Sequence, residues 1–179
     1  MHSNTFLRTG LGASDQWLYL GSELVSKSPP GCITSYETCS VDSGVSGNEI
    51  VIKGTHFRRG VVVHSPSRLM FRLDYKYISF KAKIGVSKET LDTQKCDTKR
   101  GSVTFQVLAD RRPLKLNGKS LITKTDTQKT TQIQIGVGDV AILELQTQHE
   151  SHIRSCAFSA WADAAVFVKR IYSIVYLYL

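Results

Sequence analysis

The sequence lacks the features that mark non-globular chains. Proline accounts for only 4 of the 179 residues, and no segment is of low complexity, which excludes disorder, collagen and coiled coil. Long apolar runs are missing too: the longest are residues 164–168 and 174–179, far short of the roughly 20 residues that a membrane helix needs. We therefore expect a globular chain with no complete transmembrane span.

Cysteine motifs and an export signal are also absent. The four cysteines contain no CxxC pair, so neither a zinc ribbon nor a thioredoxin-type site is indicated. Cys32 and Cys39 flank a six-residue loop, and they either close it as a disulfide or remain thiols together with Cys96 and Cys156. Residues 1–12 are polar and lack the apolar core of a signal peptide, so the sequence predicts no export signal in this chain.

Acidic residues are few relative to basic ones. The 23 Lys and Arg exceed the 15 Asp and Glu, which gives a net charge of +8 and brings nucleic acid, acidic glycans and membrane surfaces into consideration as partners. The basic residues stand singly or in pairs, such as Arg58 and Arg59, and never in a run of five or six. Because spread charge is typical of a solvated surface, nucleic acid is not an expected partner.

Helical periodicity is scarce, whereas alternation with a period of two is frequent. Ile78, Phe80, Ala82, Ile84 and Val86 face one way, as in a half-buried strand. The same alternation recurs further on, and the strands expected elsewhere are residues 17–20, 49–53, 60–64, 68–73, 103–107, 132–135, 143–146 and 161–168. Many short strands with turns between them predict an all-β fold, an antiparallel β-sandwich or jelly roll.

Two connections stand out between the expected strands. Asn117 and Gly118 form a strong hairpin signal, since both residue types accept the backbone conformation of a tight turn. Residues 87–100 are polar and are expected to form a long loop or a short helix.

Catalytic motifs are incomplete. Residues 118–120 end like a phosphate-binding loop, but Pro113 stands where that motif needs a glycine. His149 and His152 lie three apart, instead of the four of a zinc-protease helix, in a stretch without helical periodicity. No pair of carboxylates stands out as an acid and base couple. The chain is therefore not expected to be an enzyme.

Six segments occur in an order that one family shares. They read WLYLGSEL at 17–24, GNEI at 47–50, GVVVHSPS at 60–67, LDYKYISFKAKIGV at 73–86, SVTFQVLAD at 102–110 and WADA at 161–164. In this order they resemble the NPCBM family, a galactose-binding-domain-like β-sandwich often appended to glycoside hydrolases. The resemblance implies a polar N-terminal extension over residues 1–14, the module over 15–167 and an apolar C-terminal tail over 168–179.

The resemblance implies lectin-like glycan recognition through loops at the sandwich edge, for example of galactose-type sugars. Sugar binding needs an apolar ring face and planar polar groups in fixed directions. His64, at a strand end, is the leading polar candidate, with a buried histidine satisfied by backbone as the alternative. The other ligand-binding candidates are Ser65, His56, Arg58, Arg59, Tyr75 and Trp161. Trp161, like Trp17, is either a sugar platform or a core residue.

Asp163 is the one candidate metal ligand, and its alternative is a buried structural hydrogen-bonding group. The resemblance allows a structural calcium, which takes six to eight oxygen ligands and usually several carboxylates. However, Ala160 and Ser87 stand where the family has Asp, Glu23 replaces a third Asp, and Arg111 replaces a turn glycine. Fewer acids weaken the case for calcium.

We predict a non-catalytic carbohydrate-binding module whose partners are a glycan and, in a parent protein, a glycoside hydrolase catalytic domain. The family implies an extracellular or lysosomal location. Two alternatives stay open: a protein-interaction β-sandwich that has lost sugar binding, and a basic domain that binds polyanions. The tail over residues 168–179 either adds a strand, contacts a partner domain or begins a membrane span.

Overall fold

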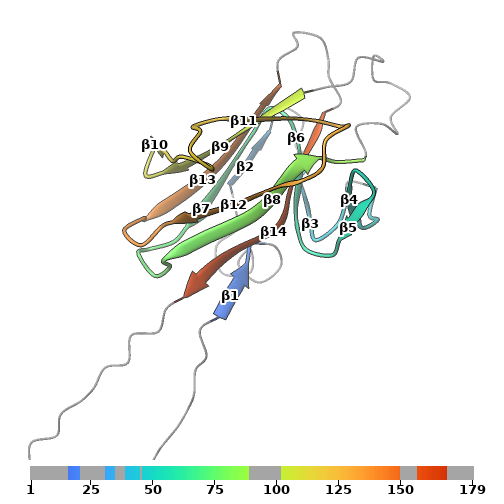
Figure 1. Cartoon of the computed structure of the whole chain (residues 1–179). Coiled ribbons are helices and arrows are strands. Elements are labelled where there is room, and N and C mark those ends of the chain that lie inside the picture. Colours follow the sequence, from blue (N-terminus) through green and yellow to red (C-terminus); the bar gives the residue numbers. More distant parts are fainter. Residues whose placement is uncertain are drawn as a thin grey trace, which may run out of the picture.

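The computed structural model describes residues 16–20, 31–34, 39–44, 46–88, 102–149 and 157–168. Within these ranges the regular structure is entirely β-strand, and every strand pairing is antiparallel (Figure 1). The described part of the chain contains no helix long and apolar enough to cross a membrane. The all-β prediction is confirmed.

Two sheets face each other and form the sandwich. The first has the order β12-β8-β14-β6-β3, with β1 paired to β14, and the second has the order β10-β9-β13-β7-β2, with β11 paired to β9. The strands of the first sheet are β1 (Gln16–Tyr19), β3 (Cys39–Val41), β6 (Gly60–His64), β8 (Ser79–Val86), β12 (Thr131–Gly136) and β14 (Phe158–Val168). Those of the second are β2 (Gly31–Thr34), β7 (Ser67–Arg72), β9 (Ser102–Ala109), β10 (Arg112–Pro113), β11 (Ile122–Thr125) and β13 (Ile142–His149).

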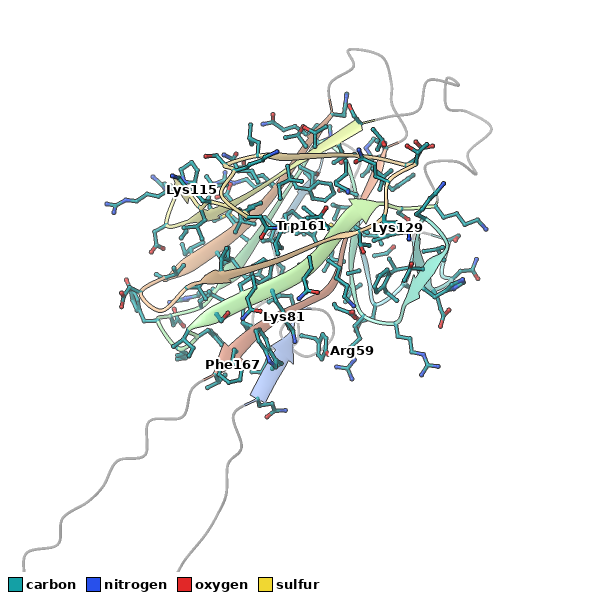
Figure 2. The ribbon with its side chains drawn as sticks, viewed as in Figure 1. Arg59, Lys81, Lys115, Lys129, Trp161 and Phe167 are labelled. Atoms are coloured by element: carbon teal, nitrogen blue, oxygen red, sulfur yellow. The ribbon has the colours of Figure 1, made fainter. Side chains whose placement is uncertain are left out.

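The core between the sheets follows from the period-two alternation. In β8 the side chains of Phe80, Ala82 and Ile84 are buried against the second sheet, while Lys81 and Lys83 face outward. Trp161 of β14 lies at the centre with no exposed surface, and its ring meets that of Phe105 edge-on at a centroid distance of 5.1 Å (Figure 2). Inward-facing residues of both sheets therefore form one continuous core.

A short hairpin packs on the outside of the first sheet. It consists of β4 (Ile50–Ile52) and β5 (Thr55–Phe57). Its turn residues Lys53 and Gly54 both have positive φ angles, of 47° and 77°, as a two-residue hairpin turn requires. The apolar side of the hairpin forms a second core cluster with β6 and β14, made of Ile50, Ile52, Phe57, Val62, Phe158, Ala160 and Ala162. This outer cluster fixes the hairpin on the sandwich.

Two further expectations from the sequence can be compared with the structure. The Asn117-Gly118 turn is confirmed, because both residues have positive φ angles and Leu116 pairs with Lys119 across them. Cys39 is disulfide-bonded. The expected extension over residues 1–14, most of the segment 87–100 and the tail after Val168 lie outside the described residues.

Candidate functional site

A cleft of about 670 Å³ opens beside the outer hairpin. Three elements that are distant in sequence form its walls: the β4–β5 hairpin, the end of β8 and the turn between β11 and β12. The lining residues are Val51, Lys53, Gly54, His56, Val86, Ser87, Lys88, Asp126 and Thr127. Most sites that bind small ligands are concave and combine apolar walls with a few polar groups, and this cleft has both.

The hairpin wall is held against the end of β8 by backbone and side-chain contacts. The Lys88 backbone N–H donates to the Val51 carbonyl at 2.8 Å. Ile52 packs directly over Gly85, so closely that a Cβ added to Gly85 would lie 2.5 Å from the Ile52 Cγ2 atom. These contacts place Val51 and His56 on the side of the hairpin that faces the cleft.

The polar groups of the cleft differ in whether they have hydrogen-bond partners. The His56 imidazole is exposed, and its Nδ1 lies 3.0 Å from Glu49 Oε2. Asp126 has a buried carboxylate oxygen, Oδ1, that accepts no hydrogen bond from any described residue. A buried carboxylate oxygen without a donor is costly. Asp126 also lines the cleft, so a small rotation of its side chain would bring this oxygen within reach of a ligand hydroxyl, which would supply the missing donor.

The structure places two of the candidate residues from the sequence on the outer hairpin or directly after it. His56 lines the cleft, and Arg58 is almost fully exposed, with its Nε 3.8 Å from Glu49 Oε1. Arg59 instead points to the other side, where its guanidinium carbon lies 4.4 Å from the centre of the Tyr19 ring. The pair of arginines is thus divided between two surfaces.

His64, Ser65 and Tyr75 lie away from the cleft. His64 is half-buried at the end of β6, edge-on to the Phe158 ring at a centroid distance of 5.1 Å. Ser65 has no exposed surface, and its hydroxyl lies within hydrogen-bonding distance of Thr147 Oγ1, at 3.1 Å, and of Ser159 Oγ, at 3.2 Å. Tyr75 is exposed in the turn before β8, at the opposite end of that strand from the cleft. These residues do not gather around one ligand.

Trp161 cannot bind a ligand, because it lies in the core. Its side chain is completely buried in the core, so neither face of its ring can meet a sugar. Among the described residues its indole Nε1 has no hydrogen-bond partner. The core alternative holds for Trp161.

Asp163 occupies an irregularity in β14, where the pairing register with β8 shifts between Ala162 and Ala165. Its φ angle is 49°, and its Oδ2 accepts from Lys83 Nζ at 2.9 Å. No group of three or more His, Cys, Asp or Glu side chains is placed to share a metal ion within the described ranges. Because calcium needs several oxygen ligands, the described surroundings of Asp163 do not fit a calcium site.

Sequence reasoning found His56 but missed the residues that face it. Lys53 and Lys88 are isolated lysines in a chain with many, and Asp126 lies in an ordinary polar turn. No local motif marks them, because the β11–β12 turn reaches β8 through the β8–β12 pairing and the outer hairpin reaches it by packing on the first sheet. The one usable local signal is Gly54, since a glycine readily accepts the positive φ angle of a tight turn.

The family comparison gives one clear match. A family model described as the NPCBM/NEW2 domain matches residues 22–167. No curated protein sequence matches the chain.

Three of the similar solved structures contain CBM51 modules of bacterial proteins. The CBM51 of Clostridium perfringens GH95, in complex with methyl-galactose, is 19% identical with a TM-score of 0.67, and the match covers 84% of this chain and 99% of that one. The CBM51-2 and INT domains of Clostridium perfringens ZmpB, with CBM51-2 in complex with GlcNAc, are 17% identical with a TM-score of 0.64, covering 76% and 29%.

Tandem CBM51 modules of the family 98 glycoside hydrolase from Streptococcus pneumoniae are 14% identical with a TM-score of 0.55, covering 75% of this chain and 42% of that one. At these identities the similarity establishes a shared β-sandwich fold. The chain corresponds to under a third of the ZmpB structures and to nearly the whole of the single GH95 module.

Proposed function

Because the chain belongs to the NPCBM/NEW2 domain family, we propose that it is a non-catalytic carbohydrate-binding module and that the cleft beside the outer hairpin receives the sugar. The observation that carries the choice of site is the buried Asp126 Oδ1, which has no hydrogen-bond donor among the described residues. A sugar hydroxyl is a donor of the right kind, because an ionised carboxylate can only accept.

The other polar groups of the cleft suit the same ligand. The His56 imidazole offers a planar group that holds a hydroxyl in a fixed direction, and the ammonium groups of Lys53 and Lys88 are donors to ring or hydroxyl oxygens. Val51, Val86 and Gly54 provide an apolar wall against which the C–H face of a sugar can lie. Galactose-type or GlcNAc-type sugars are the first to test, since similar modules were solved with methyl-galactose and GlcNAc.

The proposed partner in a parent protein is a glycan-processing catalytic domain. Similar modules occur beside such domains: one is from a GH95 enzyme and another pair from a family 98 glycoside hydrolase. Membership of the family is also the basis on which we propose an extracellular or lysosomal location. Single sites of this kind bind weakly, so a second site or module would raise the affinity through a high effective concentration.

The test is a glycan-array screen of the folded chain, with the matched variants Asp126→Asn and Asp139→Asn. Asp139 lies in the exposed turn between β12 and β13, so its variant makes the same chemical change away from the cleft. We expect Asp126→Asn to weaken glycan binding about tenfold, because a hydrogen bond to a charged group contributes about 1.5–3 kcal/mol. Asp139→Asn should bind as the wild type does.

Running the array with calcium and with a chelator separates a metal requirement from direct binding. A folded chain that binds no glycan would contradict the proposal and favour a protein-interaction module. Unchanged binding in Asp126→Asn would keep the function but reject this cleft as its site.

A further inference from the structure

A second groove, of about 240 Å³, lies on the outer face of the first sheet. It shares no lining residue with the cleft beside the hairpin. Its lining residues are Tyr19, Lys81, Ala82, Lys83, Gln132 and Asp163, which come from β1, β8, β12 and β14. The two hollows are therefore distinct sites.

The walls of this groove come from both neighbours of β14. Ala165 of β14 pairs with Lys81 of β8 on one side and with Tyr19 of β1 on the other. Because paired residues of adjacent strands point to the same face, Lys81 and Tyr19 stand on the outer face of the first sheet, on either side of β14. The groove between them therefore combines a cationic and an aromatic side chain.

Aromatic rings hold the cations along this groove. Lys81 Nζ lies 3.8 Å from the centre of the Trp17 ring, and Lys83 Nζ lies 5.3 Å from the centre of the Phe57 ring. An aromatic face attracts an ammonium group without neutralising its charge. Figure 2 shows Lys81, Arg59 and Phe167 gathered around β1, whereas Lys115 lies on the opposite side of the molecule.

The charges of the two lysines are compensated differently. Lys83 forms an ion pair with Asp163 at 2.9 Å. Lys81 pairs with no carboxylate among the described residues, and its one described polar contact is the Trp17 ring. Lys81 is thus a positioned cation with an unmatched charge, next to the amide of Gln132 and the carboxylate of Asp163.

We propose that this groove is a second ligand site, which binds a uronate residue of an acidic oligosaccharide. The Lys81 ammonium pairs with the sugar carboxylate, while Gln132 donates to and Asp163 accepts from the hydroxyls. The groove is smaller than the about 300–1,000 Å³ typical of sites for drug-sized ligands, so it fits one sugar ring. A polynucleotide would instead need a track of several unpaired cations. This site is independent of the cleft and of any sugar bound there.

The test uses trigalacturonate and its fully methyl-esterified form, titrated calorimetrically into the full chain. The acid form should bind, and the ester, which keeps the backbone but loses the charge, should bind at least about tenfold more weakly. Binding of the acid form should also weaken with added salt, because the contact is between exposed charges.

Single-residue variants test whether trigalacturonate binds in this groove. Lys81→Gln should weaken trigalacturonate binding about tenfold, and Lys81→Arg should keep it, which separates the charge from any effect on folding. Lys115→Gln removes the same charge at a distant exposed position and should change nothing, as should Asp126→Asn in the cleft.

Four results would overturn the inference. The first three are equal binding of the acid and the ester, an equal loss in Lys81→Gln and Lys115→Gln, and no binding of trigalacturonate at all. The fourth is a loss confined to Asp126→Asn, which would place the acidic sugar in the cleft. The proposed function fails separately, when neutral glycans do not bind.

Discussion

Glu144 is a charged residue buried on the outer side of the second sheet, with 2% of its surface exposed. Arg68 donates to both carboxylate oxygens, from Nε to Oε1 at 2.5 Å and from Nη2 to Oε2 at 2.8 Å, and Gln146 donates to Oε1 as well. Burial alone raises the pKa of Glu144, but the hydrogen bonds from Arg68 and Gln146 and the charge of Arg68 outweigh burial and hold the pKa below its usual value. The ionised form is therefore the one that the fold favours.

Replacing this carboxylate should cost stability in a pH-dependent way. A carboxyl group with a lowered pKa in the folded state stabilises the fold above its unfolded pKa, and this contribution is lost as the pH falls through the folded value. Glu144→Gln should lower the free energy of unfolding by about 1–3 kcal/mol at pH 7. The difference from the wild type should shrink on acidification, as urea denaturation at about pH 7 and pH 3 would measure.

Glu49→Gln is the control for that measurement, because Glu49 forms its pairs with His56 and Arg58 while half-exposed. Exposed ion pairs contribute little, so this variant should unfold like the wild type at both pH values. A Glu144→Gln variant as stable as the wild type at neutral pH would show that the Arg68 pair does not stabilise the sandwich.

At the scale of elements, the outer hairpin links the fold to the proposed site. It carries Lys53, Gly54 and His56 on the cleft side and Ile50, Ile52 and Phe57 on the sheet side. The position of the cleft wall therefore depends on how closely β4 approaches β8. Gly85 permits that approach, since any side chain there would meet Ile52.

Gly85→Ala should push the hairpin away from the sheet. The added Cβ would come within 2.5 Å of Ile52 Cγ2, and overpacking of this kind costs about 1–3 kcal/mol. We expect a lower melting temperature and weaker glycan binding in the same variant. Gly138→Ala is the matched control, because nothing lies within 4 Å of a Cβ at that turn position. Glycan binding that survives in Gly85→Ala would separate the hairpin from the site.

Every strand of five or more residues is predictable from the sequence, whereas of the shorter ones only β1 and β4 are. The alternation of β8, β9, β12 and β13 appears directly in the sequence and in the burial of the structure, although Ile78 lies just outside β8 and is exposed. β2, β3, β5, β10 and β11 are not predicted, because they have two to four residues each and lack the continuous apolar run of β1 and β4. So short a strand has no alternation to detect. Their pairing partners, and not their own residues, decide their conformation.

The site was less predictable than the fold for the same physical reason. The sequence suggests candidates that are neighbours along the chain, but Arg58 and Arg59 point to different surfaces and Ser65 turns into a buried hydroxyl network. The large apolar ring that makes Trp161 a candidate also suits a core residue. Asp126 and His56 come into one cleft only because β12 pairs with β8 and the outer hairpin packs on the first sheet.

At the scale of the whole molecule, the net charge is +8, and the basic groups differ from one surface to another in whether a carboxylate lies beside them. Near the outer hairpin the basic groups of Lys53 and Lys88 share a cleft with Asp126, whereas Lys81 is unmatched by any described carboxylate. We therefore propose a mixed-charge cleft for a neutral sugar and a cationic groove for an acidic one. The two proposals predict different responses to salt: binding of the acidic sugar should weaken as salt is added, whereas binding of the neutral sugar should not change, because screening acts on charged ligands only.

The most direct test of the central claim is an NMR titration of the isotope-labelled chain with methyl galactoside and with N-acetylglucosamine. If the cleft binds the sugar, the largest amide shifts should appear at residues 53–56, 86–88 and 126–127, the three walls of the cleft. Shifts centred on any other surface of the folded chain, or no shifts with either sugar at millimolar concentration, would contradict the account.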